Sequence, residues 1–261
     1  MIHSKNKKKI EDEIVHGKFL CQGDPEKIWG WGTPAGRLRA DRRARLIVES
    51  SALGPGMTVL EIGCGGGMFT EMFARSGADI VAVDVSPDLL ERARRRGLPA
   101  DRVRFIVADF ENMKWEVPFD AVIGSSVLHH LNPRRALTRI YKLLKPGGYL
   151  AFAEPNLLNP QVFLERTFRF LPWLEHVSPD ETAFVRWRLC GALEQAGFDD
   201  VSITPFDWLH PSTPPHAIEM VMRFGRVLEK SPVLREFSGS LFIKGRRPIK
   251  DAPAPKAEIR D

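Results

Sequence analysis

The sequence predicts a doubly wound α/β fold, in which helices cover a mostly parallel seven-stranded sheet. Three observations support this prediction. Short apolar runs alternate with helical segments between residues 57 and 153, and this alternation is typical of βαβ units. A glycine-rich turn follows the first of these runs. The chain has 261 residues, 43% of them hydrophobic, which is enough for one such domain with a full core.

The strands are expected where apolar runs are bounded by turn residues. They lie at residues 57–62, 79–83, 103–108, 119–123, 149–153, 201–206 and 240–244, and the last is expected to be antiparallel. Helices are expected at residues 68–76, after Ser86, at 133–144, at 182–197 and within 211–239. Ser86 followed by Pro87 suits a helix start, because serine caps the first turn and proline fits its first position.

The regular part of the chain is expected to form one domain over residues 51–247, with lid-like insertions at 156–181 and 211–238. Residues 1–50 are expected to supply a tail and a helical cap over the site. Residues 1–18 of this segment are rich in lysine and glutamate with little periodicity, which indicates a mobile tail. Residues 248–261 are rich in proline, alanine and charge, which indicates a disordered tail.

The composition favours a cytoplasmic protein. No segment approaches the roughly 20 apolar residues that span a bilayer, and the charged N-terminus lacks the apolar stretch of a secretory signal. The net charge of +5 comes largely from short basic runs without interleaved aromatic residues, so nucleic acid is not an expected partner. The three cysteines lack CxxC spacing, which argues against disulfides and against a metal site.

The strongest functional signal is the turn after the first strand. Gly63 and Gly65 allow a tight turn and a close approach of the backbone to a ligand. The helix that begins behind the turn offers unpaired N–H groups and the positive end of its dipole. Met68 stands where a dinucleotide fingerprint has its third glycine. The turn therefore favours a nucleoside ligand other than a dinucleotide.

Acidic residues accompany the first three strands. Glu61 lies inside the first strand, Asp84 ends the second and Asp109 ends the third. A carboxylate at the end of the second strand can accept hydrogen bonds from both ribose hydroxyls, which suits NAD as well as other nucleosides. An acid at the end of the third strand can accept from an adenine amino group, which favours an adenosine ligand.

Six motifs occur in an order that resembles a known family. They are Glu61–Gly67, Val83–Ser86, Ala108–Phe110, Phe119–Ile123, Val127–His130 and Leu143–Gly148. Over about residues 52–155 the chain resembles the class I methyltransferases that use S-adenosylmethionine (SAM), especially those acting on small molecules. The resemblance implies a Rossmann-like methyltransferase fold and SAM as the cofactor.

The resemblance also implies roles at the methionine end of SAM. Gly63, Cys64 and Gly65 would line this part of the cofactor, and Glu61 would order the loop that they form. Ser125, just after the fourth strand, would offer its backbone to the SAM amino group.

A second set of roles concerns the adenosine end. Asp84 would hold the ribose, and Val85 would pack on the adenine. Asp109 and Phe110 would recognise the adenine edge. Ordinary core packing is the alternative for Val85 and Phe110.

An oxygen or nitrogen acceptor usually needs a proton removed. The candidate bases are His129, His130, Glu154, His176 and His210. His130 follows the fourth strand and Glu154 ends the fifth, so both are expected to open on the crevice as catalytic residues. His129 and His130 are neighbours that point in different directions, so one of them is expected to be structural.

The N-terminal segment supplies two candidate cations. Arg37 and Arg39 follow a pair of tryptophans among glycines, and either could pair with the SAM carboxylate. The alternative is that both belong to the polar side of a first helix.

The acceptor is expected to be a small or lipid-like molecule methylated at oxygen. The aromatic residues of the 156–181 insertion suggest an apolar acceptor; they are Phe163, Phe168, Phe170 and Trp173. A second apolar surface lies on the helix that holds Val221 and Phe224, where core or dimer packing is favoured and peripheral membrane contact stays open.

Three other functions stay open. The chain could methylate RNA or protein, although Gly124 to Val127 lacks the signature for amino groups of nucleobases. It could bind SAM without catalysis. It could be an NAD oxidoreductase, which Met68 and the Lys145-Pro-Gly-Gly148 turn disfavour.

Overall fold

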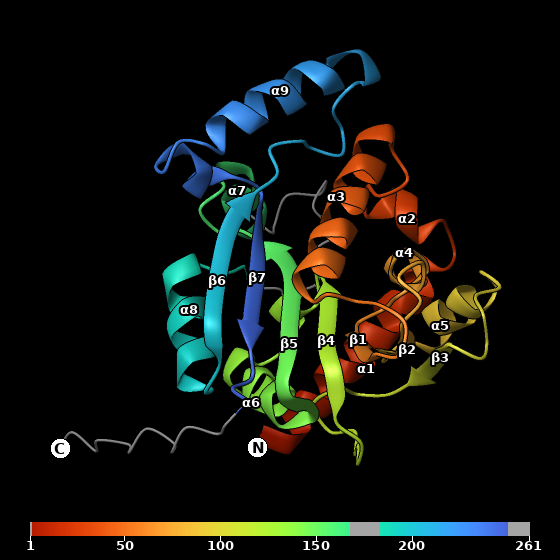
Figure 1. Cartoon of the computed structure of the whole chain (residues 1–261). Helices are drawn as coiled ribbons and strands as arrows, with labels where there is room; N and C mark the ends of the chain where they lie inside the picture. Colours follow the sequence, from red (N-terminus) through yellow and green to blue (C-terminus); the bar gives the residue numbers. More distant parts are fainter. Residues whose placement is uncertain (1, 168–182, 250–261) are drawn as a thin grey trace.

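The computed structural model describes residues 2–167 and 183–249 (Figure 1). Its centre is one seven-stranded sheet in the order β3-β2-β1-β4-β5-β7-β6. The strands are β1 (Thr58–Ile62), β2 (Asp79–Asp84), β3 (Val103–Val107), β4 (Phe119–Ser125), β5 (Leu144–Pro155), β6 (Asp199–Phe206) and β7 (Ser240–Arg246). The first five pair in parallel, and β7 is antiparallel to both β5 and β6. The predicted fold class and the antiparallel last strand are confirmed.

Helices flank the sheet on both faces and at its carboxyl edge (Figure 1). They are α1 (Ile2–Leu20), α2 (Pro25–Ile28), α3 (Pro34–Ser50), α4 (Met68–Ala74), α5 (Pro87–Arg94), α6 (Pro133–Leu143), α7 (Pro160–Thr167), α8 (Arg186–Gln195) and α9 (Ile218–Leu228). Short 3₁₀ turns are η1 (Leu128–His130), η3 (Pro215–Ala217) and η4 (Leu234–Phe237).

Three of the long helices begin with the same local chemistry. Thr33, Ser86 and Asn132 are N-caps of α3, α5 and α6, and each accepts a hydrogen bond from a backbone N–H of the first turn. A proline follows each cap at the first helical position, where its missing N–H costs nothing. The sequence alone therefore determines where these helices start.

The prediction of a mobile segment at residues 1–18 is wrong. Residues 2–20 form α1, which packs on α5. The contact is close at Gly17, where a Cβ would lie 2.2 Å from the Ser86 Oγ. α1 lies over a cavity rather than a core, so it lacks the apolar periodicity that identifies most surface helices.

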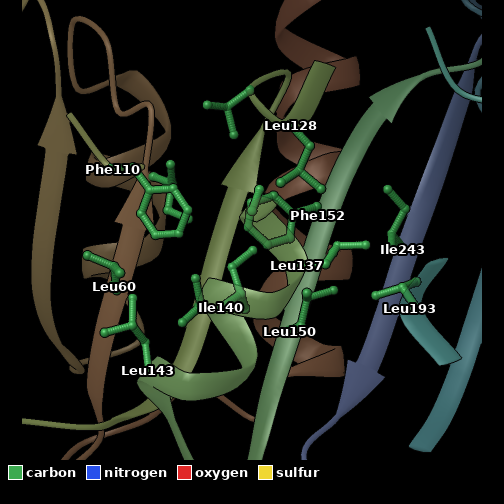
Figure 2. Close-up of a cluster of buried hydrophobic side chains, with 14 of the residues drawn as sticks. Leu60, Phe110, Leu128, Leu137, Ile140, Leu143, Leu150, Phe152, Leu193 and Ile243 are labelled. Atoms are coloured by element: carbon green, nitrogen blue, oxygen red, sulfur yellow. The ribbon is translucent and has the colours of Figure 1, made fainter. Parts of the chain in front are cut away.

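The core has one hydrophobic cluster on each face of the sheet. On one face, Figure 2 shows Leu137 and Ile140 of α6 packed against Leu60, Leu150 and Phe152 of the sheet. The other cluster packs α3, α4 and α5 against the alternate strand positions. Alanines fill several of these positions on β4 and β5, which allows α3 to approach the sheet closely.

Parts of the predicted insertions and tail lie outside the described residues. These parts are residues 168–182 and 250–261, which include Phe168, Phe170, Trp173 and His176. Within residues 2–167 and 183–249, none of the helices combines the length and apolarity needed to cross a bilayer. The same residues contain no cluster of side chains suited to hold a metal ion.

We expect Phe152→Ala to lower the free energy of unfolding by about 3–5 kcal/mol, because the ring is fully buried and the smaller side chain leaves a cavity. Phe163→Ala is the matched control, since the Phe163 side chain is 49% exposed, and its cost should be about 1 kcal/mol at most. Urea unfolding measures the free energy of unfolding of both variants. Equal losses of unfolding free energy in the two variants would contradict the assignment of Phe152 to the core.

Candidate functional site

A cavity of about 770 Å³ opens at the carboxyl ends of the parallel strands. Its floor is formed by the ends of β1, β2 and β4, and α1 with the segment around α2 covers it. This volume is typical of ligand sites. The strand order reverses between β1 and β4, and in doubly wound sheets ligands bind at that point.

The glycine-rich turn needs its glycines for backbone reasons. Gly63, Gly65 and Gly67 have φ angles of +66°, +51° and +78°, which side chains of L residues rarely allow. A Cβ on Gly63 would also lie 2.3 Å from Val127 Cγ2. The turn therefore presents bare backbone to the cavity. Cys64 borders the cavity too, and burial raises the pKa of its thiol well above the ordinary value, so the thiol stays protonated.

Asp84 ties the glycine-rich turn to the start of α5. Its carboxylate accepts from the N–H of Gly65 at 2.8 Å and from the N–H of Ser86 at 2.9 Å. Burial raises the pKa of Asp84, and the two N–H donors oppose this shift. A carboxylate has about four acceptor positions, so Asp84 at the cavity wall keeps capacity for two more donors.

Glu61 lies beneath the turn, not at the cavity. It is buried on the face that carries α4, and its Oε2 has no hydrogen-bond partner among the described residues. Burial raises the pKa of Glu61 to about 8, although the nearby Thr70 hydroxyl opposes the shift. The structure gives Glu61 no hydrogen bond to the turn; among the described residues it is Asp84 that makes one to Gly65.

The residues predicted at the adenosine end all border the cavity. Val85, Asp109 and Phe110 line it next to Asp84. The Asp109 carboxylate accepts from the N–H of Glu111 at 2.9 Å, which fixes the turn after β3. Phe110 is buried and also belongs to the core cluster that contains Leu60 and Leu137. The structure thus brings these predicted residues together.

Arg43 is a cavity residue that the sequence analysis missed. Its guanidinium is buried, donates to Ser125 Oγ, Ser126 Oγ and Ser240 Oγ, and lies over the Trp31 ring. Burial and the nearby Arg39 charge lower the pKa of Arg43 to about 10, so it remains charged at neutral pH. It stands four residues after Arg39, and this helical spacing was the available signal.

The two predicted cations, Arg37 and Arg39, lie in different surroundings. Arg39 lines the cavity, where its Nε donates to Asp207 at 2.7 Å. Arg37 is exposed on α3 and does not line the cavity, so its assignment to the cofactor site is wrong. The physical reason is that residues two apart on a helix point in different directions.

His130 borders the cavity from η1. Its Nδ1 lies 3.0 Å from Glu13 Oε1 of α1, so the ring links the strand ends to the helix that covers them. The rings of His130 and His129 are 4.2 Å apart. The side chain of His130 is a quarter exposed. It is therefore accessible to a molecule in the cavity.

Glu154 does not open on the crevice, and its assignment as a catalytic residue is wrong. It is fully buried, and its Oε1 accepts from the N–H groups of Val127 and Leu128 at 2.9 Å each. Its Oε2 lies 2.7 Å from Nδ1 of His129. Burial by itself raises the Glu154 pKa, but His129 and the two N–H donors outweigh it and hold the pKa below its ordinary value. Glu154 shapes the chain that carries His130.

Two ion pairs hold the N-terminal segment on the turn. Arg92 pairs with Asp24 at 2.8 Å, and Arg96 pairs with Glu26. Arg96 also donates to the carbonyl of Gly66. These contacts place Trp29 over the glycine-rich turn, where its ring would lie 3.4 Å from a Cβ on Gly65.

Side chains from segments outside the parallel strands also line the cavity, and we call this part of the lining the aromatic end. Trp31, Trp208 and His210 line it, together with Val162 and Gln161 of α7. His210 Nε2 lies 2.6 Å from Gln161 Nε2, which joins the segment before α9 to α7. His176 lies outside the described residues. These residues add aromatic and apolar side chains, with a few polar groups, to the same cavity that the glycine-rich turn borders.

Comparisons with known proteins agree on one family. The family model described as "Methyltransferase domain" matches residues 60–152. Nodulation protein S of Rhizobium tropici is 30% identical over 146 residues, which are 54% of this chain and 59% of that protein. The chain therefore spans little more than half the length of that relative. Ubiquinone biosynthesis O-methyltransferase of Xylella fastidiosa (strain 9a5c) is 34% identical over 189 residues, 66% of this chain and 76% of that protein.

A solved structure extends the likeness to most of the chain. N-methyltransferase NodS from Bradyrhizobium japonicum WM9, in complex with S-adenosylhomocysteine, aligns with a TM-score of 0.61 and 21% identity. The alignment covers 90% of this chain and 98% of that one. At this identity it supports the fold.

We expect Glu61→Gln to change how stability depends on pH. The pKa of Glu61 is raised from 4.5 to about 8 in the folded protein, so the folded state holds a proton that the unfolded state releases in this range. The wild type should lose stability as pH rises through this window. Glutamine does not titrate, so the variant should gain stability relative to wild type, on the order of a few kcal/mol.

Urea unfolding at several pH values checks this prediction. Glu116→Gln is the matched control, because Glu116 is exposed in the loop before β4. A pH profile of Glu61→Gln that parallels those of the control and the wild type would show that Glu61 is not held protonated.

Proposed function

The chain belongs to the class I SAM-dependent methyltransferases, and on this premise we propose that it methylates a small or lipid-like acceptor at oxygen. S-adenosylhomocysteine would be the second product. The observation that carries the proposal is the cavity itself, which is lined both by the glycine-rich turn and by the aromatic side chains Trp31 and Trp208. Two ligands can therefore meet inside it.

The residues present fit SAM. Gly63 and Gly65 expose backbone that a Cβ would cover. Asp84 has acceptor capacity left for hydroxyl donors, and Asp109 stands beside it for an amino group. Arg43 offers a buried positive charge whose Nε has no partner among the described residues. These are the groups that a ribose, an adenine and a carboxylate require.

In the proposed complex, Asp84 would hold the ribose and Asp109 with Phe110 the adenine. Gly63, Cys64 and Gly65 would line the methionine part, and Ser125 would face its amino group. Arg43, with Arg39, would balance the carboxylate. Arg43 thus takes the role at the SAM carboxylate that the sequence analysis gave to Arg37.

SAM supplies an electrophilic methyl group that needs no further activation. The protein has to align an acceptor atom in line with that group and exclude water. The covering helix α1 would help to exclude water, and Trp31 and Trp208 line the part of the cavity where an apolar acceptor would lie. His130 is proposed to take the proton of the acceptor hydroxyl, with Glu13 orienting its ring.

Two features support a small acceptor. The aromatic side chains line the same cavity as the glycine-rich turn, so the reacting atom would have to enter that cavity. The Xylella fastidiosa relative carries the name of an O-methyltransferase of ubiquinone biosynthesis, and the proposal of an oxygen on a lipid-like molecule extends that name to this chain. NodS of Bradyrhizobium japonicum is an N-methyltransferase by its name, so the acceptor atom has to be tested directly.

We expect Asp84→Asn to weaken SAM binding by about tenfold to a hundredfold, because a charged acceptor to the ribose is lost. Isothermal titration measures the affinity, and NAD serves as a control ligand that should not bind. Asp88→Asn on the exposed side of α5 is the matched control and should bind SAM like the wild type. Failure of the folded wild type to bind SAM would refute the proposal.

We expect His130→Gln to lower kcat by about a hundredfold or more while SAM affinity stays unchanged, because the acceptor then loses its base. Turnover is followed with methyl-labelled SAM on an acceptor found by screening phenols, other alcohols and amines. His216→Gln, on the exposed 3₁₀ turn η3, is the control. An unchanged kcat in His130→Gln would remove His130 from the proposed mechanism.

A further inference from the structure

Helix α9 has apolar side chains on two sides. On its inner side, Gly225 is buried against Trp208, and a Cβ there would lie 3.1 Å from the Trp208 Cβ. On its outer side, Met220, Phe224 and Val227 are 57%, 64% and 65% exposed. Their spacing of four and three residues places them in one stripe. The outer side of an ordinary surface helix is polar.

The exposed stripe continues onto neighbouring elements. Val233, Leu234 and Phe237 of the segment after α9 are 69%, 45% and 41% exposed. Phe163 and Leu164 of α7 are 49% and 52% exposed. We call these eight side chains on α7, α9 and the η4 segment the apolar rim.

A hydrogen bond joins two parts of the rim. Asn159, just before α7, donates from Nδ2 to the carbonyl of Phe237 at 2.9 Å, so α7 and η4 are adjacent. Figure 1 shows α9 above the carboxyl end of β6, with α7 below it. Single exposed apolar residues need no explanation, but a group on adjoining elements marks an interaction surface.

Positive charge accompanies the α9 part of the apolar rim. Arg223, Arg226 and Lys230 of the α9 segment are exposed and make no ion pair with any residue that the structure describes. The nearby acids are mostly neutralised, since Glu229 pairs with Arg42 and Glu236 with Arg186. Glu219 is the exposed carboxylate on α9. The rim therefore combines apolar side chains with a positive surplus, which is the composition of helices that lie on anionic membranes.

The same elements border the aromatic end of the cavity. Val162 of α7 lines it from one side, and His210 and Ser212 of the segment leading to α9 line it from another. Gly239, which follows η4, also lines it. A surface in contact with the apolar rim would thus lie next to the part of the cavity assigned to the acceptor.

We propose that the apolar rim docks on the surface of an anionic phospholipid bilayer. The apolar side chains enter the boundary between headgroups and acyl chains, and Arg223, Arg226 and Lys230 meet the lipid phosphates. A second copy of the chain is a poorer occupant. A two-fold contact through α9 would bring the same three cations of both copies together, where they repel. The docking does not depend on methyl transfer, so its test needs no turnover.

Sedimentation of the full chain with lipid vesicles tests the proposal. Two vesicle types are used, phosphatidylcholine alone and phosphatidylcholine mixed with phosphatidylglycerol. The wild type should sediment with the mixed vesicles and much less with the neutral ones. Raising the salt concentration should weaken the binding, because part of it is electrostatic.

Two pairs of variants separate the contributions of the rim. Phe224→Ser with Val227→Ser should lower the partition onto mixed vesicles by about tenfold, since two apolar side chains no longer enter the boundary. Arg223→Glu with Arg226→Glu should lower it by about tenfold or more. The controls are Val117→Ser in the exposed loop before β4 and Arg134→Glu with Arg135→Glu on α6. Both controls should bind like the wild type.

Three results would overturn the proposal. In the first, the wild type stays in the supernatant with both vesicle types. In the second, the control variants lose as much binding as the rim variants. In the third, the protein is dimeric in sedimentation equilibrium and the rim variants are monomeric, which would assign the rim to a second copy. Unchanged thermal unfolding of all variants ensures that these results do not reflect misfolding.

Discussion

Strands β1 and β4 lie side by side at the centre of the sheet, although β2 and β3 come between them in the sequence. From β1 the sheet grows in one direction through β2 to β3, and from β4 it grows in the other through β5. Parallel crossovers are right-handed, so this reversal places α4 and α5 on one face and α6 on the other. The connections leave the carboxyl ends of β1 and β4 open between them, and the cavity forms there.

Two carboxylates at strand ends then fix the turns around the cavity. Asp84 and Glu154 lie at the ends of two strands of the same sheet, and each accepts two backbone N–H groups. Asp84 accepts from Gly65 after the neighbouring β1 and from Ser86 after its own strand, and Glu154 accepts from two residues after the neighbouring β4. Buried N–H groups without acceptors are costly, so both acids stabilise turns. The two carboxylates differ in what lies over them. The end of β5 lies beneath η1 and meets His129, whereas the end of β2 faces the cavity. Only Asp84 is therefore available to a ligand.

The covering segment and the elements that carry the apolar rim both border the cavity. Glu13 meets His130 across the cavity, and Arg92 with Arg96 holds the segment around α2 on the glycine-rich turn. Residues of α7 and of the segment before α9 also line the cavity, at its aromatic end. The proposed acceptor would enter at that end, next to the apolar rim, while SAM would occupy the side covered by α1.

Local chemistry made the sheet, several helix starts and the glycine-rich wall of the cavity predictable from the sequence. Periodicity, N-caps and glycines act within a few residues, so Gly63, Gly65 and Asp84 could be placed without coordinates. The covering helix α1, the contact of Arg43 with the serines after β4 and the burial of Glu154 could not. Each depends on segments distant in the chain that meet only after folding. The sequence by itself determined which strand ends carry acids, and tertiary packing decided which of those acids a ligand can reach.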